Sequence, residues 1–251
     1  MTDFFRALIT AFLFLTRIPI PTLADYREQD SGAAFPLFPL VGLTLGVILS
    51  GSALFLANHL TAGVCAALIL LLWVALTGGL HLDGLGDSAD GWLAGGDKTR
   101  TLEIMKDPRS GSAAVIIIAV SLLLKWTVLE QIIIGQHWWA LALAPMLARA
   151  LALTLFLTTP YVSPKGIAES FLQHASRTQM RVSVAASTLI LFAMLSFNDA
   201  SSGLIAALAI LLGLRYLMMK RLGGTTGDTS GALIEWVEIF FLIGVLWNAI
   251  A

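Results

Sequence analysis

Three aspartates in one short glycine-rich segment are the residues of this chain best suited to chemistry. Residues Gly78–Gly91 read Gly-Gly-Leu-His-Leu-Asp-Gly-Leu-Gly-Asp-Ser-Ala-Asp-Gly and contain Asp83, Asp87 and Asp90. Their i, i+4, i+7 spacing places the three carboxylates on one face of a helix. Like charges so close together need a cation, and carboxylate oxygens suit Mg²⁺ or Mn²⁺. The pattern predicts metal-dependent chemistry on a phosphate; the alternative is a solvated loop with turn glycines.

A second polar segment, residues 223–232, reads Gly-Gly-Thr-Thr-Gly-Asp-Thr-Ser-Gly-Ala and is followed by two glutamates. Its glycines allow close backbone approach, so that successive N–H groups can bind an anion. The acids can share one helical stripe. Carboxylates inside an apolar span usually face a polar site. The alternative is a helix cap with glutamates that reach toward the interface. The candidates are Gly224, Gly227, Asp228, Glu235 and Glu238.

Two further side chains are candidates, one within the first glycine-rich segment and one inside an apolar segment. His81, within the first segment, can bind metal, contact a phosphate or another part of a substrate, or hold a structural hydrogen bond. Arg149 lies in the middle of an apolar segment, where a guanidinium must meet a carboxylate or a phosphate. A phosphate contact and a structural ion pair both remain open for Arg149.

Four other charged residues have less specific patterns around them. Lys106 and Arg109 suit a diphosphate. Lys125 and Glu130 occur in one apolar segment, and we expect a structural pair or a site near the outer face from them.

The composition sets these residues in a membrane. The chain has 251 residues, 57% of them hydrophobic and 12% charged, with a mean hydropathy of +0.85. Soluble domains carry about 25% charged residues. Cys65 is the one cysteine, which excludes a disulfide framework and a thiolate metal site. We expect a lipid bilayer and no nucleic acid as surroundings; a homo-oligomer is compatible with the sequence.

The expected fold is an all-α, polytopic transmembrane bundle that forms one catalytic domain over residues 1–251. Phe4–Leu15 is short and flanked by arginines, so we expect an interfacial or tilted helix there; the alternative is a membrane span. About seven spans are expected, at Ala33–Ala57, Thr61–Leu80, Gly111–Ile134, Trp138–Leu157, Val182–Phe197, Gly203–Met219 and Gly231–Ile250.

Lys and Arg alternate between the connections of these spans. The connections near Asn58, Gln136 and Asn198, and the C-terminal tail, carry none. The positive-inside rule therefore places both acidic segments in the cytoplasm. The basic residues of the opposite side are Arg17, Arg27, Lys98, Arg100, Lys106, Arg109, Lys165, Arg177, Arg181, Arg215, Lys220 and Arg221.

These motifs resemble the cobalamin-5′-phosphate synthase family over nearly the whole chain. The block Gly-Gly-x-His-x-Asp-Gly-Leu-x-Asp-x-x-Asp-Gly is specific. Gly86 departs from the alanine usual there, and the serine that usually follows Asp107 is missing. The segments that carry the resemblance are Leu15-Thr16-Arg17-Ile18-Pro19, Phe38-Pro39-Leu40-Val41-Gly42, Gly78–Gly91, Leu102-Glu103-Ile104-Met105-Lys106-Asp107, Arg149 and Gly223–Glu238.

The resemblance implies that adenosylcobinamide-GDP is joined to α-ribazole, or its 5′-phosphate, with release of GMP. It implies Mg²⁺ as cofactor and a bacterial or archaeal cytoplasmic (inner) membrane, with the active site facing the cytoplasm. The catalytic candidates are Asp83, Asp87, Asp90 and Asp228. The metal-ligand candidates are these four with Glu235 and Glu238. The substrate-binding candidates are His81, Lys106, Arg109, Arg149, Gly224 and Gly227.

Two other functions fit part of the pattern. Asp83-Gly84, Asp87 and Asp90 resemble, with compressed spacing, the motif of CDP-alcohol phosphatidyltransferases, which transfer lipid headgroups. A secondary transporter also uses intramembrane acids. Its site would lie at the midplane, whereas these acids gather at one face. We expect both acidic segments to border one cavity, because either alone leaves carboxylates uncompensated.

Overall fold

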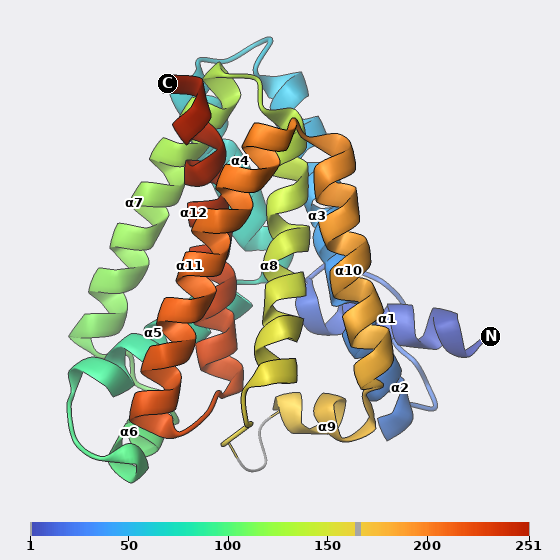
Figure 1. The fold of residues 1–251 in the computed structure, drawn as a ribbon, viewed down its shortest axis with the longest axis vertical. Helices are drawn as coiled ribbons and strands as arrows, with labels where there is room; N and C mark the ends of the chain where they lie inside the picture. The colour runs from blue at the N-terminus through green and yellow to red at the C-terminus, as the bar shows by residue number, and fades with distance from the viewer. Residues whose placement is uncertain (1, 164–166, 251) are drawn as a thin grey trace.

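A computed structural model describes residues 2–163 and 167–250, and these fold into a bundle of helices (Figure 1). Long apolar runs without breakers favour helix, since a helix satisfies its own backbone hydrogen bonds in lipid. The helices are α1 Asp3–Leu15, α2 Glu28–Ala34, η1 Phe35–Leu37, α3 Phe38–Leu56, α4 Ala62–Thr77, α5 Leu80–Leu93, α6 Lys98–Ile104, α7 Ser112–Ile134, α8 Trp138–Thr158, α9 Ile167–His174, α10 Arg177–Met194, α11 Phe197–Leu222 and α12 Gly227–Ile250.

The expected all-α bundle is present, but the count of about seven spans is not confirmed. Among the described residues, five helical stretches are long and apolar enough to cross a membrane: Glu28–Leu56, α7, α8, α11 and the part of α12 from Gly227 to Asn248. Helices α4 and α5 together make a sixth if their bent pair counts as one span. Helix α10 falls short because its first turns carry Arg177, Gln179 and Arg181.

Helix α8 forms the centre of the bundle and is buried along almost its whole length. Gly42 and Gly46 of α3 lie directly against it. A side chain at either glycine would collide with the backbone of α8 at Pro145 or Ala142. Small residues at a four-residue interval let two helices approach closely in a membrane, where packing drives association. By contrast, α7 and α11 expose large apolar residues such as Ile116 and Leu212, as lipid-facing helices do.

The chain bends by 87° between α4 and α5. Gly78 and Gly79 both have left-handed backbones, with φ of 65° and 69°. Glycine adopts this conformation without the strain that a side chain causes. The bend takes α5, with its three aspartates, away from the direction of α4 and across the end of the bundle.

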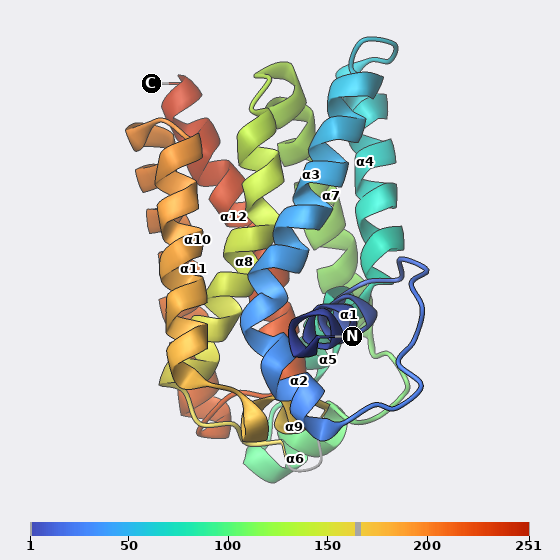
Figure 2. The ribbon, with the colours of Figure 1, turned by 90° about the vertical axis from the view of Figure 1, so that its right-hand side faces the viewer.

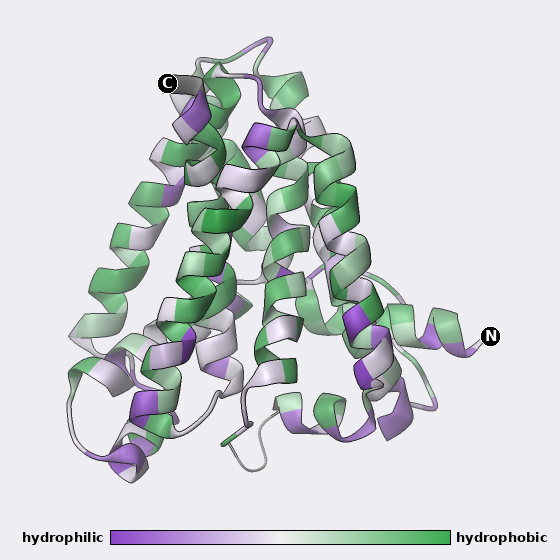
Figure 3. Cartoon of the chain, viewed as in Figure 1, coloured by the Kyte–Doolittle hydropathy of each residue, from purple (hydrophilic) through white to green (hydrophobic). Residues whose placement is uncertain are grey.

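The connections sort to two ends of the bundle as the charge pattern predicts. Figure 1 shows the α3–α4, α7–α8 and α10–α11 connections and the C-terminus at the upper end, and α5, α6 and α9 at the lower end. Polar residues gather around α6 and α9 at the lower end (Figure 3). Lys165, one of the basic residues expected there, lies outside the described residues.

Helix α1 lies across the bundle instead of along it, as Figures 1 and 2 show. It is not among the helices long enough to span a membrane. Its buried Arg6 pairs with Asp30 of α2, at 2.7 Å, and with Asp25 of the loop between α1 and α2, at 2.9 Å. This ion pairing raises the pKa of Arg6. The arrangement agrees with the interfacial helix expected at Phe4–Leu15.

Candidate functional site

A cavity of about 360 Å³ opens at the lower end, where α5, α12, α8 and the N-terminal helices meet. It brings together two of the predicted acids, Asp83 and Asp228, with His81, Lys106 and Gly227. The two polar segments of the sequence therefore border one space. The full set of predicted site residues nevertheless divides into three groups: cavity residues, a buried ion cluster and residues placed elsewhere.

The four aspartates form one electrostatic cluster. Asp83, Asp87 and Asp90 lie on a single helix, α5, as their spacing predicts. The carboxylate of Asp87 is half-buried and is repelled by Asp83, Asp228 and Asp90. Asp228 also feels the positive charge of Lys106. Such a concentration of negative charge is unfavourable without a nearby cation, and the predicted metal remains a prediction.

Close contact between α5 and α12 creates this cluster. A Cβ atom at Gly84 would lie only 2.7 Å from the backbone oxygen of Asp228, and one at Gly231 would lie 3.4 Å from the Cα of His81. The two glycines let the helix backbones approach each other. Residues more than 140 positions apart in the chain thereby reach the same cavity.

Asp90 has a second role that the sequence does not reveal. Its carboxylate accepts hydrogen bonds from the backbone N–H of Gly111, at 2.6 Å, and of Ala114, at 2.9 Å. These groups belong to the start of α7, whose first N–H groups have no partner within the helix. Asp90 therefore caps α7 and fixes it to α5, and a carboxylate there also complements the helix dipole.

The first turn of α12 faces the cavity through Gly227, Asp228, Ser230 and Gly231. A reciprocal pair of hydrogen bonds between Thr226 and Thr229 holds this turn: each backbone N–H donates to the other side-chain oxygen, at 2.9 and 3.1 Å. A helix N-terminus presents N–H groups and the positive end of the dipole, and both favour a bound phosphate.

Glu235 and Glu238, predicted as metal ligands, lie deeper in the bundle and have protein cations as partners. Lys125 donates to Glu235 at 3.0 Å and to Glu238 at 2.5 Å, and Arg149 pairs with the other oxygen of Glu238. All four side chains are buried. Two positive and two negative groups form a neutral cluster, so no metal is needed to neutralise these glutamates. We assign them a structural role.

This ion cluster also corrects the expected partner of Lys125. Its ammonium pairs with the two glutamates of α12 and lies 4.0 Å from the centre of the Trp73 ring, whereas Glu130 is not its partner. For Arg149, the ion-pair alternative is the one that the structure realises. The partners of both cations lie on another helix, α12, and the sequence pattern within one helix does not show which helices pack together.

His81 links the ion cluster to the cavity. Its Nδ1 lies 3.4 Å from a terminal nitrogen of Arg149, and its side chain is 4% exposed. Arginine has only donors, so Nδ1 is the acceptor of this contact. Arg149 thus reaches the cavity through His81.

Besides Arg149, two predicted substrate contacts are not among the residues that line this cavity. Arg109 is exposed and pairs with Asp107 at 2.7 Å, which lowers the pKa of Asp107 to about 2. Gly224 packs against the backbone at Pro160, where a side chain would collide. Lys106 does line the cavity, two residues after the end of α6.

The cavity contains one wall that sequence analysis missed. Aromatic rings from five elements line it, together with Tyr161 and Ser163. Burial raises the pKa of Tyr161 above its usual value, so its hydroxyl stays protonated at neutral pH. No spacing signal connects these rings, since they meet only in the folded chain; they are Phe14, Phe35, Phe38, Phe156 and Phe171.

Comparison with known proteins agrees with the resemblance in the motifs. A family model described as cobalamin-5-phosphate synthase matches residues 7–246. The adenosylcobinamide-GDP ribazoletransferase of Stutzerimonas stutzeri (strain A1501) is 46% identical over 239 residues, which cover 95% of this chain and 96% of the relative. The protein of that name from Pseudomonas fluorescens (strain SBW25) is 45% identical over 238 residues, 94% of this chain and 97% of the relative. No solved structure matches the chain. The match over almost the whole length places this chain in the cobalamin-5-phosphate synthase family.

Proposed function

We propose that this protein transfers the cobinamide-linked phosphate of adenosylcobinamide-GDP to α-ribazole, or to its 5′-phosphate, and releases GMP. The observation that carries the proposal is the cavity in which Asp83, Asp228, Lys106 and the start of α12 meet. A diphosphate needs positive charge and N–H donors at its oxygens, and its acceptor needs a base. The named relatives supply the identity of the two substrates.

Each group that lines the cavity has a distinct role in the proposed transfer. Lys106 and the N–H groups at the start of α12 bind the diphosphate oxygens. A carboxylate that lines the cavity, Asp83 or Asp228, takes the proton of the attacking ribose hydroxyl. The hydroxyl oxygen forms the new bond to phosphorus, and the bond from that phosphorus to the oxygen of GMP breaks. The aromatic wall excludes water, which would otherwise compete as the acceptor.

Asp83 and Asp228, which line the cavity, would hold Mg²⁺ together with the phosphates of the substrate, with the carboxylate of Asp87 nearby and Asp90 as the anchor of α7. Among residues 2–163 and 167–250, no three His, Cys, Asp or Glu side chains converge tightly enough to hold a metal alone. Mg²⁺ commonly uses one or two carboxylates together with substrate phosphates and water, so the cluster fits an ion that arrives with the diphosphate. When bound, Mg²⁺ offsets the negative charge of the diphosphate and of the departing GMP.

We further propose that the bundle lies in the inner membrane with this cavity at the cytoplasmic face. The basic residues at the lower end support this orientation.

The direct test is GMP release by the purified full-length protein in detergent. Adenosylcobinamide-GDP, α-ribazole phosphate and Mg²⁺ are supplied together, and each is then omitted in turn. GMP should appear only in the complete mixture and should stop with EDTA. Release without the α-ribazole compound would indicate hydrolysis, and release of CMP from a CDP-alcohol would favour the lipid headgroup transferase instead.

A further inference from the structure

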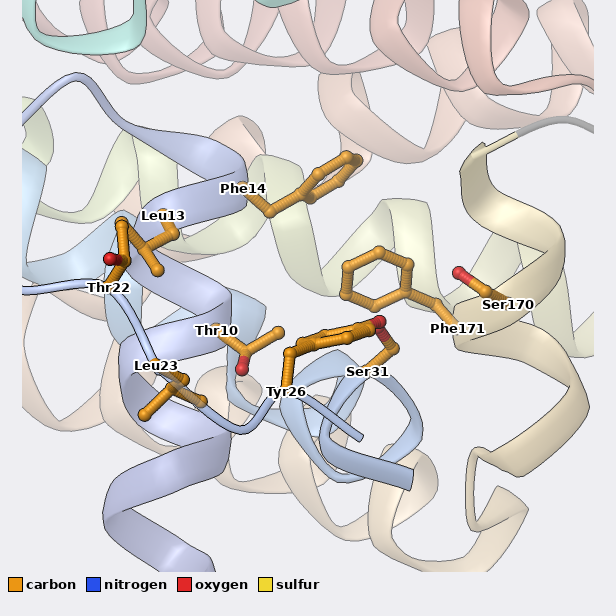
Figure 4. A pocket seen from close by; sticks show the side chains of 9 residues that line it. All are labelled: Thr10, Leu13, Phe14, Thr22, Leu23, Tyr26, Ser31, Ser170 and Phe171. Atoms are coloured by element: carbon orange, nitrogen blue, oxygen red, sulfur yellow. The ribbon is translucent and has the colours of Figure 1, made fainter. Parts of the chain in front are cut away.

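A second cavity, of about 390 Å³, lies beside the acid-lined cavity at the N-terminal side of the bundle. Figure 4 shows it between α1, the loop before α2, and α9. Phe14 and Phe171 line both cavities, so the two are neighbours with a shared aromatic wall. We call the second one the aromatic cavity; its lining residues are Thr10, Leu13, Phe14, Thr22, Leu23, Tyr26, Ser31, Ser170 and Phe171.

The lining determines what chemistry the aromatic cavity can accept. Among the residues that the structure describes, its lining has no charged side chain, which is unfavourable for a phosphate or for a lipid headgroup. The rings of Phe14 and Phe171 lie with their centres 4.6 Å apart. Tyr26 is 55% exposed, so a ligand can cover its ring. Aromatic faces with leucines nearby favour a neutral, planar, apolar group.

One pair of hydroxyls adds a specific polar contact. The oxygens of Tyr26 and Ser31 lie 2.5 Å apart, and either can be the donor. A hydrogen bond between two hydroxyls uses one of their two protons, so the pair retains one O–H donor. Ser31 is buried and Tyr26 is exposed, so that donor lies among mostly apolar lining residues.

We propose that the aromatic cavity binds the base of α-ribazole, an inference that rests on the proposed function. This base is a substituted benzimidazole: two fused aromatic rings with a single unsubstituted ring nitrogen that accepts a hydrogen bond. The rings pack against Tyr26 and Phe171, and the nitrogen accepts from the Tyr26–Ser31 pair. The ribose then extends past Phe14 into the acid-lined cavity, where its hydroxyl meets the carboxylates.

A lipid acyl chain is the main rival occupant, because it also favours an apolar space near the membrane. It carries no acceptor, and so it gains nothing from the hydroxyl pair. The double variant Tyr26→Phe/Ser31→Ala therefore separates the two occupants, since it removes both hydroxyls and keeps the aromatic ring. Leu23→Trp partly fills the cavity from a surface loop and reduces space for either occupant.

The experiment measures steady-state kinetics of GMP release with each substrate varied in turn. The double variant should raise the KM for α-ribazole about three- to tenfold, the effect of one neutral hydrogen bond. The KM for adenosylcobinamide-GDP and kcat should stay unchanged. An α-ribazole analogue with indole in place of benzimidazole lacks the acceptor nitrogen, so wild type and double variant should use it equally well. Leu23→Trp should raise the KM for α-ribazole and for the indole analogue. The matched control is Tyr216→Phe, on the exposed side of α11, which should change neither KM.

Equilibrium dialysis of α-ribazole with the detergent-solubilised full chain gives an independent readout. If wild type releases no GMP, the proposed function fails while dialysis still tests the aromatic cavity. An unchanged KM and affinity for α-ribazole in both cavity variants would overturn the inference. The inference would also be overturned if the double variant raised the KM for α-ribazole and for its indole analogue equally. The same holds if only Leu23→Trp raised these KM values. Either result would indicate that the hydroxyl pair does not bind the ring nitrogen.

Discussion

Glu238→Gln tests whether the buried ion cluster is structural. Glu238 is 0% exposed and is, among residues 2–163 and 167–250, the one carboxylate that pairs with both Lys125 and Arg149. The change keeps the shape but leaves a buried cluster with one excess positive charge. Breaking a buried pair in this way costs about 3–5 kcal/mol of unfolding free energy. For a chain of this size, roughly 2–4 °C per kcal/mol then predicts a fall of about 6–20 °C in the unfolding midpoint.

The assay is thermal unfolding of the detergent-purified protein, followed by tryptophan fluorescence. The double variant Lys125→Met/Glu238→Gln restores neutrality, with Arg149 and Glu235 as the remaining charges, and should recover more than half of the loss. If Glu238 were a metal ligand, the Mg²⁺ concentration for half-maximal activity would rise sharply in the surviving enzyme. A midpoint shift below about 2 °C, or a changed Mg²⁺ requirement, would refute the structural assignment.

Three further predictions address the cavity and its orientation. Asp83→Asn should reduce GMP release at least 100-fold. It should not lower the thermal stability, because it removes one of several repelling charges. Asp90→Asn should reduce GMP release and also lower the unfolding free energy by about 1 kcal/mol, because it weakens the cap of α7. Equal stability of the two variants by thermal unfolding would contradict the capping role. Gly84→Ala should reduce activity more than tenfold, since its Cβ would lie 2.7 Å from a backbone oxygen at the start of α12; wild-type kinetics would show that the helices tolerate separation. Cysteines placed at exposed positions Lys98 and Asn58 should react with a membrane-impermeant reagent from the cytoplasmic and outer sides, respectively, and labelling from one side only would rule out the topology.

The sequence alone determined the helical class, the position of the polar ends and the core of the candidate site. Apolar runs of span length predict helices because only internally hydrogen-bonded segments are stable in lipid. The spacing of Asp83, Asp87 and Asp90 predicts one helix face because helical geometry is local. The count of spans was less well determined, since α10 mixes polar and apolar residues and α4 ends at the glycine bend.

Tertiary structure alone decided which charged groups meet. Glu235 and Asp228 belong to the same helix and carry the same functional group, yet one faces Lys125 and the other borders the cavity. The difference depends on which neighbouring helix each side of α12 contacts, and periodicity within α12 contains no information about those neighbours. The cap of α7 by Asp90 and the aromatic wall also join residues from separate elements. Interactions within one helix follow from its own sequence, whereas contacts between helices depend on how the whole bundle packs.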